Sequence, residues 1–147
     1  MIASGPDTGQ FVPLGEFGLK IRTLDAPVGA ASALKMSYAG ITKGFTALGS
    51  MMLLAAIRGG IENELRAELE RSHPAFVATF KRAVPDMFGK AYRFVGEMHE
   101  IADFVGEDDA ARKMYLAFAE FYQRIAADFD GKQEETGALA KFLERKS

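Results

Sequence analysis

The chain has 147 residues, 48% hydrophobic and 26% charged, which is typical of a single soluble globular domain and excludes disordered or fibrous proteins. Its net charge of −2 argues against a nucleic-acid partner. Cysteine is absent and only His73 and His99 are histidines, so we expect neither disulfides nor a metal site. Since no signal peptide begins at Met1, the cytoplasm is the expected location.

Charge and glycine are unevenly distributed along the chain. Residues 1–60 carry a net charge of +2 and most of the 15 glycines, whereas residues 61–147 carry −4. The sparsely charged first part is therefore predicted to pack against a neighbour, which need not be in this sequence.

The first residues are predicted to form a fragment of an α/β structure. Ile2 and Ala3 are interpreted as the end of a strand. Residues 6–17 are predicted to form a short helix that ends at Gly18, with Phe11, Val12 and Leu14 directed inward. Apolar and polar residues alternate over residues 19–24, which predicts a second strand. Such a fragment would need further strands to be stable.

A turn at residues 25–29 leads into a stretch without proline, residues 28–58, that is predicted to be one helix roughly 45 Å long. Between Lys43 and Arg58 it has 14 uncharged residues, fewer than the roughly 17–25 that a membrane span needs. We therefore interpret it as a buried central helix and predict no membrane association. Glycine inside a helix is destabilising, so its glycines should have a packing reason.

Amphipathic helices are predicted for the rest of the chain. Ile61, Leu65 and Leu69 form the apolar side of the first, opposite a ladder of charges at Glu62, Arg66 and Glu70. Ser72 is predicted to cap the next helix, which should end before Pro85. Later helices are predicted up to Gly106, from about Asp108 to Phe129, and after Lys132. The predicted fold class is all-α, with several helices around a long central one after a short α/β remnant.

One residue of the central helix has the character of a catalytic group. Lys35 lies two turns into the apolar helix, between Leu34 and Met36, where an ammonium group is costly unless it faces a cavity, a partner or a ligand. A lysine in such a place can serve in proton transfer. The alternative from spacing alone is that its side chain reaches the surface near the start of the helix.

The segments ALKMSYAG at residues 33–40 and RFVGEMHEI at residues 93–101, with the turn at residues 25–29, resemble the β-hydroxyacid dehydrogenase superfamily. This superfamily includes 3-hydroxyisobutyrate and 6-phosphogluconate dehydrogenases. The resemblance is to the C-terminal helical domain of phosphogluconate-dehydrogenase-like NAD-binding proteins. It covers nearly the whole chain and implies that residues 1–26 are the tail of an NAD(P)-binding Rossmann domain and residues 27–147 the helical domain.

The resemblance implies roles for particular residues. Lys35 matches the catalytic lysine and Gly29 one of the turn glycines. The usual pattern has glycine at Ala31 and asparagine at Ala39, so substrate hydrogen bonds are expected instead from Ser32 or Tyr38. His99 stands near a lysine–aspartate pair of the superfamily and is a candidate substrate contact, with a plain helix-surface histidine as the alternative.

Two functions remain open at this stage. The first is the C-terminal domain of an NAD(P)-dependent dehydrogenase that acts on a small hydroxy acid. The G-x-G-x-x-G fingerprint of dinucleotide binding is absent, so this chain alone is expected to be inactive and to bind neither NAD nor NADP tightly. The second is a non-enzymatic helical module for oligomerisation or binding. The resemblance implies a homodimer in both cases, because the long helix and the helical domain usually form the dimer interface in this superfamily.

Overall fold

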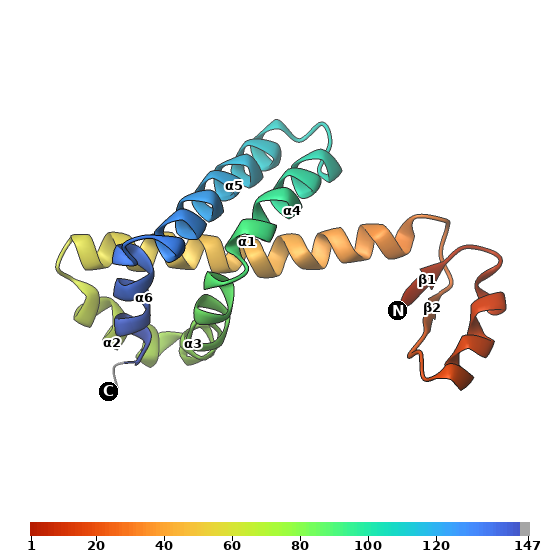
Figure 1. Ribbon diagram of the computed structural model, residues 1–147, viewed down its shortest axis with the longest axis horizontal. Coiled ribbons are helices and arrows are strands. Elements are labelled where there is room, and N and C mark those ends of the chain that lie inside the picture. Colours follow the sequence, from red (N-terminus) through yellow and green to blue (C-terminus); the bar gives the residue numbers. More distant parts are fainter. Residues whose placement is uncertain (145–147) are drawn as a thin grey trace. The chain divides into compact units, whose positions relative to one another are not determined.

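The computed structural model describes residues 1–144, which form six α-helices, one 3₁₀ helix and a two-stranded sheet (Figure 1). The fold class is all-α, with a long helix and a small α/β remnant, as the sequence predicted. The chain divides into an N-terminal unit, residues 1–39, and a C-terminal unit that starts at Gly40. Helix α1 (Ala30–Arg58) belongs to both units.

The N-terminal unit holds the sheet. Strand β1 (Ile2–Ser4) pairs in parallel with β2 (Arg22–Leu24), with Ile2 opposite Arg22. The strand predicted over residues 19–24 forms only in its second half, because β1 offers three residues for pairing. Figure 1 shows the two strands side by side, with the connecting helix beyond them.

The connection between the strands is the 3₁₀ helix η1 (Thr8–Phe17). Gly18 ends it in the left-handed conformation, with φ of 82°, so the predicted stop is confirmed. The inward placement of three apolar residues was wrong, because no residue of η1 is buried; these residues are Phe11, Val12 and Leu14. Pro13 inside the helix cannot donate a backbone hydrogen bond, which disfavours a regular helical ladder there.

Three glycines let aromatic side chains approach the backbone of α1 in the C-terminal unit. A Cβ atom at Gly40 would lie 2.8 Å from Tyr115 Oη, and one at Gly44 would lie 3.3 Å from the Phe118 ring. A Cβ atom at Gly49 would overlap the ring of Phe80. The glycines thus have the packing reason that the sequence analysis required.

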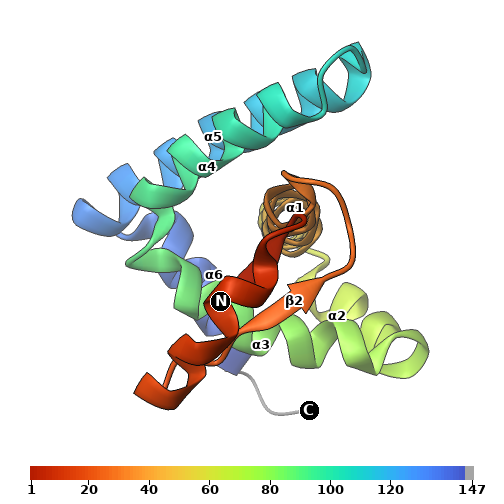
Figure 2. The same cartoon turned by 90° about the vertical axis from the view of Figure 1, so that its right-hand side faces the viewer.

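Helices α4 (Ala91–Phe104) and α5 (Asp109–Asp130) form an antiparallel pair that runs side by side in both views (Figures 1 and 2). The interior of the C-terminal unit includes fully buried side chains from this pair: Met98, Ile101, Tyr122 and Ile125. Helix α5 starts where the sequence predicted, and Asp108 caps it by accepting a hydrogen bond of 3.0 Å from the Ala111 N–H.

Helices α2 (Glu62–Ser72), α3 (Pro74–Phe88) and α6 (Glu134–Glu144) complete the unit. Viewed along α1 in Figure 2, α2 and α3 lie on one side of that helix and the α4–α5 pair on the other. Arg66 departs from the predicted surface ladder because its side chain is buried, with Nη1 donating to the Phe142 carbonyl at 2.8 Å.

Two predicted helix boundaries were wrong. Ser72 does not cap α3: it ends α2, and its hydroxyl donates back to the Glu68 carbonyl at 2.7 Å. Helix α3 does not end before Pro85 but continues to Phe88. Pro85 lies in the last turn, where it removes one helical hydrogen bond, and the buried side chains of Val84 and Met87 hold that turn in place.

Helix α1 is also long and apolar enough, by length and composition, to cross a membrane. The core helix of a soluble protein meets the same criteria. From Gly40 onward α1 carries eight buried residues: Gly40, Gly44, Thr46, Ala47, Ser50, Leu53, Leu54 and Ala56. This burial is the arrangement expected of a core helix.

We predict that Gly49→Ala destabilises the protein, because the new methyl group would displace the buried Phe80 ring. Overpacking of this kind costs about 1–3 kcal/mol in the free energy of unfolding. The matched control is Gly137→Ala in α6, where nothing lies within 4 Å of the new Cβ atom and helix propensity favours alanine by up to about 1 kcal/mol. Urea denaturation measures both variants, and equal stabilities would contradict the packing role of Gly49.

Asp128, near the end of α5, holds the first turn of α6. Its carboxylate accepts hydrogen bonds of 2.8–2.9 Å from the N–H groups of Glu134 and Thr136 and from the Thr136 hydroxyl. Partial burial alone would raise the pKa of Asp128, but the hydrogen bonds from Thr136, Glu135 and Glu134 outweigh it and lower this pKa below its usual value.

Because this pKa is lowered in the folded protein, the ionised carboxylate stabilises the fold above its ordinary pKa and ceases to do so as the pH falls through the lowered value. We predict that Asp128→Ala lowers the free energy of unfolding by about 0.5–2 kcal/mol at neutral pH. This loss of unfolding free energy should become smaller in acid. Urea denaturation of the protein and the variant at neutral pH and at acid pH measures the difference. Asp103→Ala, on the exposed surface of α4, is the control that should change little.

Candidate functional site

The start of α1 is anchored to the sheet by a side-chain hydrogen bond. The Ser4 hydroxyl at the end of β1 accepts a hydrogen bond of 3.0 Å from the Ala31 N–H in the first turn of α1. On the neighbouring strand, the Arg22 N–H donates to the Met1 carbonyl at 3.0 Å. The two strands and the beginning of α1 therefore form one connected local structure within the N-terminal unit.

Gly29 makes the turn that starts α1. Its φ of 92° lies in the left-handed region that side chains disfavour, so the turn favours glycine. Its carbonyl accepts a hydrogen bond of 2.9 Å from the Ala33 N–H, which is the first helical bond of α1. The side of the helix on which Ser32 and Lys35 lie is thus set by this turn.

Lys35 is exposed, as in the alternative that its side chain reaches the surface near the start of the helix. The apolar sequence around it suggested burial, but no residue of the N-terminal unit is buried. Lys35 nevertheless faces a cavity, which is one of the situations that the sequence analysis allowed for a lysine in this helix.

Two hollows of the N-terminal unit meet at Lys35. The smaller one, about 290 Å³, is lined by Ile2, Ala31, Ser32 and Lys35. The larger one, about 390 Å³, is lined by Ile2, Arg22, Leu34, Lys35 and Tyr38. Both volumes are close to or within the range of small-molecule sites. The structure therefore brings together three of the predicted site residues, since Lys35 lies at both hollows, Ser32 at the smaller and Tyr38 at the larger.

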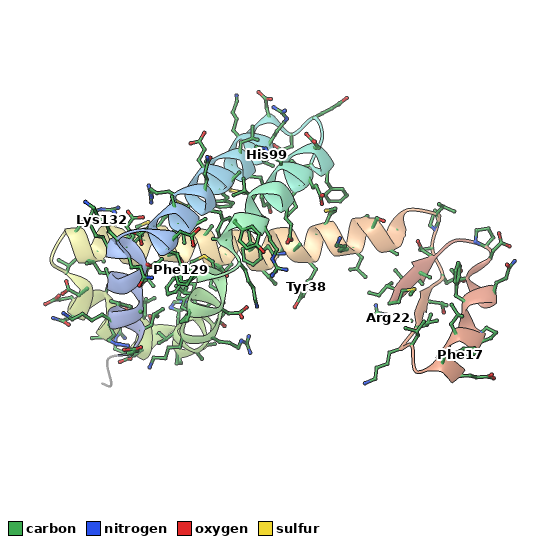
Figure 3. The ribbon with its side chains drawn as sticks, viewed as in Figure 1. Phe17, Arg22, Tyr38, His99, Phe129 and Lys132 are labelled. Carbon is green, nitrogen blue, oxygen red and sulfur yellow. The ribbon has the colours of Figure 1, made fainter. Side chains whose placement is uncertain are left out.

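Sequence reasoning missed two residues of these hollows, Ile2 and Arg22. They face each other in the register of the parallel strands. Arg22 was noticed only as the polar member of an alternating strand, since a pairing between residues 20 positions apart leaves no local signal. Figure 3 shows Arg22 on β2 and Tyr38 on α1.

His99 lies on α4 in the C-terminal unit and lines neither hollow. Its side chain is exposed, as the alternative of a plain helix-surface histidine predicted (Figure 3). Within residues 1–144, no group of three or more histidine, aspartate or glutamate side chains could hold a metal ion.

The polar pair closest in sequence to His99 joins α1 to α4 within the C-terminal unit. Lys43 Nζ forms an ion pair with Glu97, and the same ammonium group lies 4.7 Å from the centre of the Phe94 ring. The buried Tyr122 hydroxyl donates to the Lys43 carbonyl at 2.6 Å. Burial, and then the negative charge of Glu97, raise the pKa of Tyr122 well above its usual value. These contacts fasten three helices and give Lys43 a structural role.

Comparisons with known proteins agree with this architecture. Residues 56–125 match the model of a domain of unknown function, DUF1932. Among solved structures, the chain is similar to the conserved protein MTH1747 of unknown function, itself described as structurally similar to 3-hydroxyacid dehydrogenases. The two share 28% sequence identity with a TM-score of 0.67, over 91% of this chain and 51% of the other. This chain thus spans about half the length of MTH1747. No curated protein matches.

Proposed function

Because the chain carries a DUF1932 domain and the fold of 3-hydroxyacid dehydrogenase-like proteins, we propose that it is the C-terminal domain of an NAD(P)-dependent oxidoreductase. The reaction would interconvert a CH–OH group and a carbonyl group in a small hydroxy acid. The observation that carries the proposal is the position of Lys35, at two hollows beside the glycine turn that opens the long helix.

The proposed domain organisation places residues 1–26 in the tail of a Rossmann domain and residues 27–147 in the helical domain. Two features of the N-terminal unit support this division. Its two strands are parallel, and parallel strands are characteristic of sheets whose faces are covered by helices. Its apolar side chains are exposed, including Phe17 and Val28 at 80% each, as expected of residues that pack against a further domain.

The residues of this chain do not fit a nicotinamide nucleotide by themselves. Strand β1 leads through Gly5 and Pro6 into a 3₁₀ helix, instead of through a glycine-rich turn into an α-helix whose N–H groups could bind a pyrophosphate. We therefore assign NAD or NADP to the complete oxidoreductase and expect no tight binding by this chain alone.

Lys35 would handle the proton of the reaction. As an ammonium group it donates a hydrogen bond to the substrate oxygen and supplies the proton when the carbonyl is reduced; as an amine it removes that proton when the alcohol is oxidised. Ser32 at the smaller hollow and Tyr38 at the larger are placed to hydrogen-bond the substrate beside it. Gly29 would contribute through the turn, and His99, exposed on α4, has no assigned part in this site. Such a protein would work in the cytoplasm, with no membrane or nucleic acid as partner.

We predict that Lys35→Ala, in the protein that carries this chain together with a dinucleotide-binding domain, reduces turnover by about 10²–10⁴-fold, the usual contribution of a general acid–base group. Nucleotide binding, followed by NAD(P)H fluorescence, should stay nearly unchanged. Lys20→Ala is the matched control, because Lys20 lies near β2 but lines neither hollow. Unchanged turnover in Lys35→Ala would remove Lys35 from the mechanism.

A second candidate function, a non-enzymatic module for oligomerisation or binding, is favoured by one observation. Helix α1 presents an exposed apolar stripe within the C-terminal unit, formed by Ile41, Leu48, Met52 and Ala55. No charged residue occurs between Lys43 and Arg58, so a second copy of the chain could pair along this stripe without burying a charge. We propose a homodimer through this stripe for either function.

The dimer predicts that Leu48→Glu, which places a charge in the middle of the stripe, converts the protein to a monomer in sedimentation-velocity experiments. Met114→Glu on α5 is the control, because Met114 is exposed to a similar extent, 47% against 51%, but lies off the stripe. A dimer that survives Leu48→Glu would contradict this interface. Measured turnover by the complete protein would favour the oxidoreductase over the non-enzymatic module.

A further inference from the structure

A hollow in the C-terminal unit, where three helices meet, has no part in the proposed reaction. Its volume is about 170 Å³, which suits one chemical group of a ligand better than a whole drug-sized molecule. The end of α3, the first turn of α4 and the end of α5 supply its lining: Phe88, Gly89, Tyr92, Ala126, Phe129 and Asp130. Half of these residues are aromatic.

The aromatic rings favour a cation in this hollow. Phe88 and the labelled Phe129 in the last turn of α5 (Figure 3) are half-buried, with ring centres 6.1 Å apart and ring planes inclined at 33°. Tyr92 is 66% exposed, and its ring already has the guanidinium carbon of Arg93 at 5.9 Å from its centre. The faces of such rings attract positive charge. Three rings at one small hollow therefore suit a cation whose surface is made of methyl groups.

The charges around the hollow have the same preference. Within residues 1–144, Asp130 is the only charged residue of the lining, and its carboxylate belongs to no ion pair. Lys90 and Lys132, which flank lining residues in the sequence, each pair with a different acidic residue. Two helices end at the hollow and one begins there, so two partly negative helix ends oppose one partly positive end. A bound cation would therefore meet a net negative environment.

We propose that this hollow binds an alkylated ammonium group, and in particular a trimethylammonium group. The rings contact its methyl groups, and Asp130 supplies the opposite charge. A neutral group of the same shape would gain only the apolar contact, whereas a small inorganic cation would keep its water shell and gain little from the rings. This site is independent of the reaction proposed at Lys35.

The test is a titration of the 147-residue chain with choline at constant ionic strength, followed by the amide signals of Gly89, Tyr92 and Asp130 in two-dimensional NMR. We expect saturable shifts. Choline should bind about tenfold or more tightly than 3,3-dimethylbutanol, its neutral isostere with carbon in place of nitrogen. A trimethyllysine peptide that binds more tightly than choline would identify a protein side chain as the source of the group, and the reverse order would identify a small molecule.

Two variants separate the charge from the rings. Asp130→Asn removes the opposite charge and should weaken choline binding by about two- to fivefold. Tyr92→Leu removes one ring and should weaken it by about two- to fivefold as well, whereas Tyr92→Phe keeps the ring and most of the affinity. Both side chains are exposed, so the variants should fold normally. Asp103→Asn is the matched control, because Asp103 is an exposed acid on α4 outside the hollow.

Four results would each overturn the proposal. They are absence of saturable shifts with choline, equal binding of the neutral isostere, equal effects of Asp130→Asn and Asp103→Asn, and shifts of the same signals that sodium chloride produces as strongly as choline.

Discussion

The C-terminal unit depends on the close approach of aromatic rings to the backbone of α1 at three glycines. Tyr115 lies against Gly40, Phe118 against Gly44, and Phe80 against Gly49. Phe80 also stacks on Phe45 with ring centres 4.9 Å apart, so α3 is held to the same helix by a second contact. A side chain at Gly49 would displace the Phe80 ring, and one at Gly40 or Gly44 would require Tyr115 or Phe118 to shift. This packing requires glycine at these positions, although glycine inside a helix carries a conformational cost.

Polar contacts join particular helices in addition to the apolar packing. The Lys43–Glu97 ion pair and the hydrogen bond from Tyr122 to the Lys43 carbonyl bring α1, α4 and α5 to one point. At the other end of the unit, buried Arg66 donates to the Phe142 carbonyl and so ties α2 to α6. The buried Tyr122 hydroxyl and the buried Arg66 guanidinium group are costly when unpaired, so each disfavours alternative packings in which its partner would be lost.

The candidate site has a different physical character from this core. It is built where a short parallel sheet meets the first turns of α1, and none of its residues is buried. The Ser4 hydroxyl on the Ala31 N–H and the left-handed turn at Gly29 determine where the helix begins relative to the strands. Accurate placement with exposed side chains suits a substrate site, which must be reachable and yet hold its reacting groups in position.

The sequence by itself determined the all-α class, the long central helix and the start of α5 near Asp108, because helical periodicity and the residues that favour helix starts are local signals. It failed at Ser72, whose hydroxyl donates back to the Glu68 carbonyl, and at Pro85, where the buried side chains of Val84 and Met87 hold the turn in place. It also failed at Arg66, which is buried although its spacing from Glu62 and Glu70 predicted a charged surface. The tertiary structure alone decided that Lys35 is exposed and that Arg22 shares its cavity. The physical reason is that cavities and ion pairs join residues distant in sequence, and no local pattern records which of them meet.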